Sequence, residues 1–333
     1  MIRIEELLSS RFKTSQAVGA AFGIFEEGDV RSLCYGLCST SGPAISENSI
    51  FELGSITKIF TTAILMNLVD RQMVSLSDSI KKFFPFLKFA KSRIQEVTLE
   101  HLATHYSGLP NLPANLTPID VRNPYQDYDI QDLYDLLTSP SLSKIRQDRF
   151  EYSNLGVGLL GHILCLATQK SYSQLVSEII FDQLNMSNTS SYPLLKTPAE
   201  LCQGYFLRQA SPLWDCTEAF AGALSIRSSI HDMMQFFIAN FIADRPLGSL
   251  SKCHLIRRSI DHKESIGLGW LIDHSKGDPI IWHDGITSGF QSFIGFNPQK
   301  QRGVVALTNS SADWILPLSF KILTSPQIAL GLK

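Results

Sequence analysis

The chain has 333 residues, of which 44% are hydrophobic and 18% are charged, and its formal net charge is −2. This length predicts two domains or one large domain with an inserted lobe, and the composition excludes a disordered chain, which would be polar and highly charged. Because the sequence contains no dense run of Lys and Arg, we expect a small-molecule or peptide partner and no nucleic acid.

The N-terminal residues bear on the compartment. The stretch MIRIEELLSSRFK places Glu5 and Glu6 where a signal peptide would have an uninterrupted apolar stretch. No run approaches the roughly 20 apolar residues that span a bilayer. We therefore expect a cytoplasmic protein without a membrane span. A periplasmic or secreted protein is the alternative if a leader has been removed, and the sequence does not specify an oligomeric state.

The first elements along the chain are a predicted β-hairpin and a predicted buried helix. Short apolar runs at 17–25 and 32–37 flank turn residues, which is typical of a hairpin. Residues 56–70 contain no Gly or Pro and repeat apolar positions at helical spacing. This pattern predicts a buried helix with Ser55 at its start.

The middle of the chain, roughly 73–224, is expected to be an inserted helical lobe. Its helical patterns are broken by Pro and Gly, as in SGLPNLPANLTP, and 155–167 and 172–184 are predicted helices. The chain then changes to a β pattern after a further helix at 229–241. The predicted strands are 268–272, 280–283, 292–296 and 303–307, and the stretch from Trp314 is expected to be helical.

The hairpin and the late strands are too short to stand alone, so we expect them to join one antiparallel sheet. The predicted class is α+β, with a sheet domain formed by 1–72 and 225–333 and a helical lobe at 73–224. The active site is expected in the cleft between them.

A serine and a lysine three residues apart form the first candidate catalytic pair. A serine hydroxyl is a weak nucleophile at neutral pH, and Lys58 would share a helix face with Ser55 and could activate it. The positive end of the helix dipole would favour the developing anion. The same SxxK spacing occurs five times, so spacing alone is not specific; the serines are Ser10, Ser55, Ser79, Ser141 and Ser249. Only Ser55 follows a glycine and precedes a long apolar helix, and a helix-capping serine is the structural alternative.

Two further motifs each occur once in the chain. They are Tyr152-Ser153-Asn154 within EYSNLGVGLLG, and His283-Asp284-Gly285 within HDGITSGFQSFIGFNP. Together with FELGSITKIF, and in this order, they resemble the three motifs of the serine β-lactamase and penicillin-binding family, in its class C and esterase branch. LEHLATHYSGLP, AGALSIRSSIHDMMQF and GVVALTNS extend the resemblance over nearly the whole chain. It implies a β-lactamase-like fold.

The resemblance also implies catalytic roles. Ser55 would be the nucleophile, Lys58 its activator, and Tyr152 a general base or proton relay. Tyrosine ordinarily titrates near about 10, so we expect the charge of Lys58 to depress the pKa of Tyr152. Which of Lys58 and Tyr152 takes the serine proton stays open at this point.

The remaining implied roles concern substrate binding. Asn154 would hydrogen-bond Lys58 and the substrate amide, and the backbone N–H groups of Ser55 and Ile286 would form the oxyanion hole. Gly285 belongs to the same substrate-binding strand. The family chemistry needs no metal or cofactor.

One departure from the family pattern bears on the substrate. Where β-lactamases of this family have Lys-Thr-Gly, this chain has His283-Asp284-Gly285. A lysine is a permanent cation suited to a substrate carboxylate, whereas histidine is near-neutral at pH 7. The HxG form is typical of the family's esterases and D-amino-acid peptidases, although His283 could instead merely pack against Trp282. We therefore expect a serine hydrolase that cleaves a small ester or amide through an acyl-enzyme on Ser55.

Several alternatives stay open. Within the family they are a true class C-like β-lactamase, a D-Ala-D-Ala carboxypeptidase and an acyltransferase or transesterase. Outside enzymes, the alternative is an inactive binding or scaffold member. A metal site is disfavoured, because His101 and His105 have helical i, i+4 spacing but lack the Glu of HExxH. The six cysteines form no CxxC pair and are expected to be mostly buried thiols.

Overall fold

The computed structural model describes residues 2–89, 93–192, 200–241, 247–248, 250–275, 277–311 and 313–329. The helices within these ranges are α1 (Ile4–Ser15), α2 (Thr57–Asp70), α3 (Leu99–Ala103), α4 (Ile130–Thr138), α5 (Asn154–Thr168), α6 (Tyr172–Val176), α7 (Glu218–Leu224), α8 (Ile230–Phe241) and α9 (Ile315–Thr324). The strands are β1 (Ile2–Arg3), β2 (Gly19–Glu26), β3 (Asp29–Gly36), β4 (Ile50–Glu52), β5 (Gly204–Phe206), β6 (Gln209–Ser211), β7 (Arg227–Ser229), β8 (Arg258–Ser259), β9 (Glu264–Ile266), β10 (Leu271–Asp273), β11 (Ile280–Ile286), β12 (Gln291–Asn297), β13 (Arg302–Thr308), β14 (Ser310–Ser311) and β15 (Ile328–Ala329).

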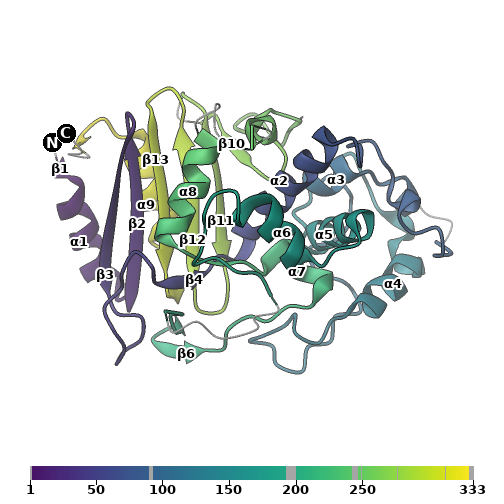
Figure 1. Ribbon diagram of the computed structural model, residues 1–333, viewed down its shortest axis with the longest axis horizontal. Coiled ribbons are helices and arrows are strands. Elements are labelled where there is room, and N and C mark those ends of the chain that lie inside the picture. Colours follow the sequence, from purple (N-terminus) through teal and green to yellow (C-terminus); the bar gives the residue numbers. More distant parts are fainter. Residues whose placement is uncertain are drawn as a thin grey trace.

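An antiparallel sheet forms one side of the molecule (Figure 1). In the described part of the chain it has eight strands, in the order β3-β2-β13-β12-β11-β10-β9-β8. The N-terminal hairpin β2–β3 lies beside β13, with Ile24 opposite Val304. The two distant parts of the chain therefore form one sheet, which confirms the predicted α+β class.

Helices cover both faces of this sheet. On one face, α1 and α9 pack against the strand residues that alternate toward them; this core contains Leu8, Phe22, Ile24, Phe293, Val304, Leu318 and Ile322. On the other face, α8 lies against the backbone of β2 and β13 (Figure 1). Glycines allow this close approach, because a Cβ at Gly303 would lie 1.9 Å from the Phe237 ring and one at Gly23 would lie 2.2 Å from Met234 Sδ.

The helices α2, α3, α5, α6 and α7 form a group beside β10 and β11 (Figure 1). The central helix α5 is buried from Asn154 to Cys165, which is typical of a helix that is apolar on all sides. It contacts α7 through two glycines, since a Cβ at Gly222 would lie 2.8 Å from the Cα of Gly161. This contact sets the position of α7 next to α2.

Three details differ from the sequence predictions. The sequence predicts a helical segment at 73–224, yet this segment contains β5 and β6, which pair with each other, and β5 also pairs with β14. Three-residue strands are too short to show alternation. The helix expected over 172–184 ends at Val176 and continues as a π-helical turn. The strand expected at 268–272 begins at Leu271, because Gly269 has a positive φ of 74°. The division into two domains stays a prediction.

Two sequence expectations concern the whole chain. Among the described residues, no helix is both long and apolar enough to cross a membrane. The six cysteines are free thiols, and all except Cys34 are buried. Burial raises the pKa of the Cys34 thiol to about 11, so this thiol is protonated at neutral pH.

The contact between Gly161 and Gly222 generates a stability prediction. We expect Gly222→Ala to lower the free energy of unfolding by about 1–3 kcal/mol, because the new methyl group would meet backbone atoms that cannot move alone. Urea unfolding measures the change. Gly156→Ala, in the facing helix α5, is the matched control, since the nearest atoms to its methyl group would be in the Ser153 and Ser107 side chains, at 3.1–3.4 Å. Equal losses for the two variants would contradict a backbone contact as the cause.

Candidate active site

Ser55 lies in a short 3-10 turn that leads directly into α2. The preceding Gly54 has a positive φ of 53°, a conformation that glycine adopts without steric cost. A Cβ at Gly54 would come within 3.0 Å of the backbone N of Ile286, and a Cβ at Gly285 would lie 2.0 Å from Leu53 O. The two glycines therefore let the turn and the end of β11 touch backbone to backbone.

This contact determines where two backbone N–H groups lie. The backbone N of Ser55 is 3.0 Å from the position a Cβ would take at Gly285, one residue before Ile286. The N–H groups of Ser55 and Ile286 thus belong to two backbone segments that touch each other. Paired backbone donors beside a nucleophile are the arrangement that stabilises an oxyanion.

Lys58 lies directly behind Ser55 and has no exposed surface. Its Nζ is 2.8 Å from Ser55 Oγ, a hydrogen-bond distance, and it donates a hydrogen bond to Ala223 O on α7 at 3.2 Å. Burial holds the pKa of Lys58 well below its usual range, and the charge of Asp284 offsets this only in part. A neutral amine at this position can accept a proton from the serine.

Tyr152 completes the contact around Ser55. Its ring centroid is 5.0 Å from Lys58 Nζ, and the Ser55 hydroxyl is near enough to lower the pKa of Tyr152 in part. The expected depression of its pKa is wrong in direction: burial raises the pKa of Tyr152, and the Asp284 carboxylate adds to the rise. The cause is that a phenolate loses more by desolvation than the hydrogen bond from Ser55 returns. Tyr152 is therefore a protonated phenol.

Asn154 lies at the start of α5 but does not bond as expected. Its Nδ2 donates to Tyr125 Oη at 3.2 Å, and its backbone N–H donates to Asn111 Oδ1 at 3.1 Å. Among the described residues, its Oδ1 is buried without a hydrogen-bond partner. The expected bond from Asn154 to Lys58 is thus replaced by the bond from Lys58 to Ala223 O.

His283 lies on β11, next to Tyr152, and only 1% of its surface is exposed. The two ring centroids are 6.4 Å apart. Its Nδ1 lies 2.6 Å from the carbonyl O of Asp284, and a carbonyl can only accept, so Nδ1 carries the proton. Burial, with a smaller contribution from the charge of Lys58, lowers the pKa of His283 to about 3. His283 is therefore a neutral side chain at neutral pH.

A second histidine supports Tyr152 from another side. The ring of His105 lies 4.5 Å from that of Tyr152, and its Nδ1 accepts a hydrogen bond from the Ser153 N–H at 3.1 Å. His105 has a positive φ of 59° and lies beyond the end of α3. His101 Nδ1 accepts from Thr98 N, and the described residues contain no group of three metal-ligating side chains.

Sequence reasoning missed four neighbours of the site. They are His105, Asn111, Tyr125 and Ala223, and each acts through a tertiary contact. For His105 a signal was present in HLATHYSGL, but the segment was weighed only as a metal site or a structural segment. For Asn111, Tyr125 and Ala223, no residue pattern in the sequence indicates that they contact Asn154 or Lys58.

The other SxxK serines have different surroundings. Ser10 and Ser141 are exposed, and Ser79 is an extended residue that bridges to Thr98 just before a 3-10 helix. Ser249 lies outside the described residues. Among the side-chain hydrogen bonds of the described residues, Ser55 is the SxxK serine whose hydroxyl is bonded to the amine of its own lysine.

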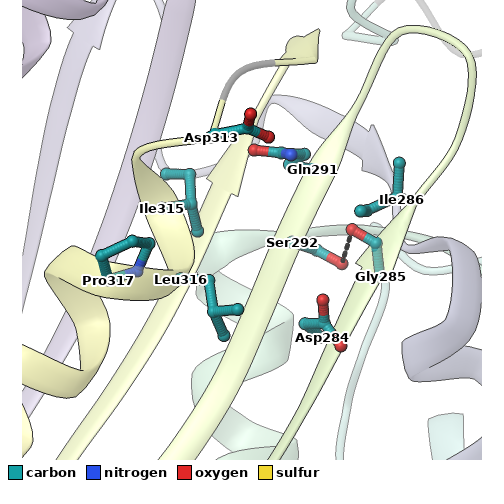
Figure 2. Close-up of a pocket in the computed structure, with 9 residues that line it drawn as sticks. All are labelled: Asp284, Gly285, Ile286, Gln291, Ser292, Asp313, Ile315, Leu316 and Pro317. Atoms are coloured by element: carbon teal, nitrogen blue, oxygen red, sulfur yellow. Dashed lines mark hydrogen bonds between the residues drawn. The ribbon is translucent and has the colours of Figure 1, made fainter.

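A cavity of about 270 Å³ lies next to Gly285 and Ile286, between β11, β12 and the start of α9 (Figure 2). Figure 2 shows Asp313 at the top of the lining residues and Asp284 at the bottom, with Ile315, Leu316 and Pro317 of α9 along one side. The described lining residues include no Lys or Arg; they are Asp284, Gly285, Ile286, Gln291, Ser292, Asp313, Ile315, Leu316 and Pro317. The cavity is thus apolar with an acidic character.

The arrangement of sheet, helices and the Ser55 turn is a fold seen in known structures. A class C beta-lactamase matches with a TM-score of 0.82 and 21% identity, over 97% of this chain and 95% of that one. A mutant of a class C beta-lactamase also gives 0.82 and 21%, over 96% and 95%. The fold is therefore that of the class C beta-lactamases.

The sequence comparisons assign the family. The model of the Beta-lactamase family matches residues 4–314, so the chain belongs to this family. Protein flp of Staphylococcus aureus (strain NCTC 8325 / PS 47) is 23% identical over 285 residues, which cover 81% of this chain and 55% of flp. The chain thus spans about half the length of the flp proteins it matches. A Beta-lactamase of Psychrobacter immobilis is 24% identical over 353 residues, covering 89% of this chain and 80% of that protein.

The buried neutral His283 generates a pH prediction. In the unfolded chain an imidazole titrates near about 6.5, so between that pH and about 3 the unfolded state binds more protons than the folded state. Stability then falls as the pH falls, and His283 contributes a loss of about 2 kcal/mol between pH 7 and pH 5. Urea unfolding at the two pH values should show that the loss of stability is smaller by about 2 kcal/mol in His283→Gln than in the wild type. Other histidines whose pKa is lowered by burial, such as His162 and His254, contribute to the loss that remains. Ile281→Val, on the same strand, is the control and should lower the free energy of unfolding equally at both pH values. If His283→Gln loses as much stability between pH 7 and pH 5 as the wild type does, the assignment of this loss to His283 is refuted.

Proposed function

We propose that the protein is a serine hydrolase that cleaves a small ester or amide through an acyl-enzyme on Ser55. The observation that carries the proposal is the fully buried Lys58, whose Nζ lies 2.8 Å from Ser55 Oγ. A lysine that only stabilised the fold would extend its amine to water, because burying a charge without a carboxylate partner is costly. The family membership supports the same chemistry.

The pKa directions favour one sequence of proton transfers. Neutral Lys58 accepts the proton of Ser55 as its Oγ attacks the substrate carbonyl, and the N–H groups of Ser55 and Ile286 stabilise the oxyanion. Tyr152, a protonated phenol that contacts both Ser55 and Lys58, donates its proton to the leaving group and recovers one from Lys58. Water then attacks the acyl-enzyme, giving its proton back through the same groups, and releases the acid.

The charges around the site favour a substrate without a carboxylate. His283 is neutral where a family β-lactamase has a lysine, and the adjacent cavity contains Asp284 and Asp313. A carboxylate placed there would be repelled at short range and would find no cation among the described lining residues. This supports a neutral ester or amide over a β-lactam or a D-Ala terminus, both of which carry a carboxylate.

Hydrolysis of β-lactams is the second candidate function. It is favoured by the relative named Beta-lactamase and by the fold shared with class C beta-lactamases. Transfer of the acyl group to an alcohol or amine would use the same acyl-enzyme, with a different acceptor in place of water. Product analysis with added acceptors separates transfer from hydrolysis.

Covalent labelling tests the role of Ser55. Intact-protein mass after incubation with a fluorophosphonate should show one adduct on the wild type and none on Ser55→Ala, and ester turnover should fall by at least about 10³-fold. Ser10→Ala, an exposed SxxK serine, is the matched control and should label and turn over like the wild type. An unlabelled wild-type protein would instead indicate an inactive binding or scaffold member of the family.

The same experiment with a penicillin separates the substrate classes. We expect fluorophosphonate labelling without a lasting penicillin adduct or penicillin turnover. Ser55-dependent turnover of penicillin at a rate comparable to that of p-nitrophenyl esters would overturn the ester or amide assignment in favour of a β-lactamase.

The acidic cavity generates a specificity prediction. Asp284→Asn removes one negative charge beside the substrate site, and we expect it to raise kcat/KM for carboxylate-bearing substrates relative to neutral ones on the order of tenfold. Paired assays with p-nitrophenyl acetate and mono-p-nitrophenyl succinate measure this ratio. Asp278→Asn, which removes an exposed carboxylate outside the cavity lining, is the control. An unchanged ratio in Asp284→Asn would show that Asp284 does not repel the substrate.

A further inference from the structure

A second cavity, of about 410 Å³, lies beyond Ile286 at the end of β11. This volume falls in the range of about 300–1,000 Å³ that is typical of ligand pockets. Three large apolar side chains on its lining are exposed: Val121 by 79%, Phe206 by 53% and Ile286 by 52%. Such side chains come from three separate segments and meet at one concave site, which marks an apolar ligand surface.

Trp214 forms a rigid wall of this cavity. Its indole N–H donates to Arg122 O at 2.8 Å and to Ser288 Oγ at 2.7 Å. Its backbone N–H donates to Glu52 Oε1, and its carbonyl accepts from Arg227 Nη2, both at 2.7 Å. The aromatic face is thus held in place before any ligand binds, which reduces the entropy lost on binding.

The cation on the lining is already neutralised. Arg122 contributes to the cavity, but its guanidinium is bonded to both carboxylate oxygens of Asp120, at 2.9 and 3.1 Å. Its carbonyl is occupied by the bonds from Trp214 and Ser288. The cavity therefore offers apolar surface, and no free charge is directed at a ligand among its described lining residues.

The hairpin that carries Phe206 has an unusual tip. Leu207 and Arg208 both have positive φ, 48° and 65°, where a tight hairpin normally uses Asn or Gly. Leu207 is also 77% exposed. Non-glycine residues in this conformation cost free energy and concentrate at functional sites, so the strain is consistent with a hairpin that is selected for its position at the cavity.

The position of the cavity indicates which part of a substrate it holds. His283, in the middle of β11, lies beside Tyr152, which is the proposed proton donor to the leaving group. The cavity lies at the C-terminal end of β11, where Ile286, Thr287 and Ser288 line it. From His283, the chain therefore reaches the cavity at Ile286, whose N–H is a proposed oxyanion donor. A leaving group must stay near its proton donor, so the acyl group extends toward the cavity.

We propose that this cavity binds an apolar acyl group, so that the preferred substrates are esters or amides of medium-chain or aryl-substituted acids. This rests on the proposed serine hydrolase function. Lengthening the acyl chain should then transfer one methylene at a time from water to the cavity between Trp214, Phe206 and Val121 until it is full.

A series of p-nitrophenyl esters from acetate to octanoate tests the proposal. We expect kcat/KM to rise about threefold to fourfold per added methylene, the effect of burying one CH₂, until the cavity is filled. A flat or falling series would overturn it. Turnover that persists in Ser55→Ala would instead refute the proposed function.

Substitutions locate the effect in the cavity. Phe206→Ala and Val121→Ser change exposed side chains, so the fold should survive, and each should lower the octanoate-to-acetate ratio on the order of fivefold. Ile256→Ala, an apolar residue 56% exposed and outside the cavity lining, is the matched control and should keep the wild-type ratio. Chain-length dependence that is unchanged in both cavity variants would overturn the assignment.

Binding to Ser55→Ala tests the cavity without catalysis. Octanamide should bind this variant at least tenfold more tightly than butyramide in calorimetric titrations, and Phe206→Ala in the same background should reduce the difference. If octanamide binds as expected while wild-type protein hydrolyses no ester, the acyl site stands and the hydrolase assignment fails. If chain length has no effect on binding, the acyl site is refuted whatever the turnover.

Discussion

The turn that carries Ser55 touches the end of β11 backbone to backbone, and the rest of the site depends on this contact. Two glycines make it possible, because a Cβ at Gly54 or Gly285 would overlap the other segment. The turn is also fixed from behind: Glu52, three residues before Ser55, forms a buried ion pair with Arg227 at 3.1 Å. Ser55, the proposed nucleophile, is therefore held between the sheet and the helices by main-chain geometry.

The second constraint is electrostatic. Lys58, His105 and His283 are all buried around Tyr152, and burial is the main cause that lowers the pKa of each one. The charge of Lys58 lowers the pKa of the two histidines further. Lowering the pKa of these bases costs free energy of folding, because the unfolded chain can protonate them more readily. Enzymes commonly accept such a loss of stability where a reactive group must be kept unprotonated.

Features that follow from local sequence patterns could be predicted, whereas features that depend on tertiary contacts could not. The Ser55–Lys58 contact follows from i, i+3 spacing on one helix, and the sheet followed from short β-rich runs at both ends of the chain. The partner of Asn154 could not be predicted, because Tyr125 reaches it from a loop whose path no periodicity describes. The sign of the Tyr152 pKa shift failed for a related reason: it depends on how deeply the ring is buried, and a motif carries no information on depth.

The register of the sheet has a consequence for how the chain folds. The hydroxyl of Thr308 on β13 donates to Gly19 O on β2, 289 residues away along the chain. The β2–β3 hairpin emerges early from the ribosome, but the outer edge of β2 has no partner until β13 is made. Such long-range pairing slows folding and leaves an open strand edge in the meantime, which other chains can pair with. Expression of this protein should therefore benefit from conditions that slow synthesis or supply chaperones, independently of the stability of the finished fold.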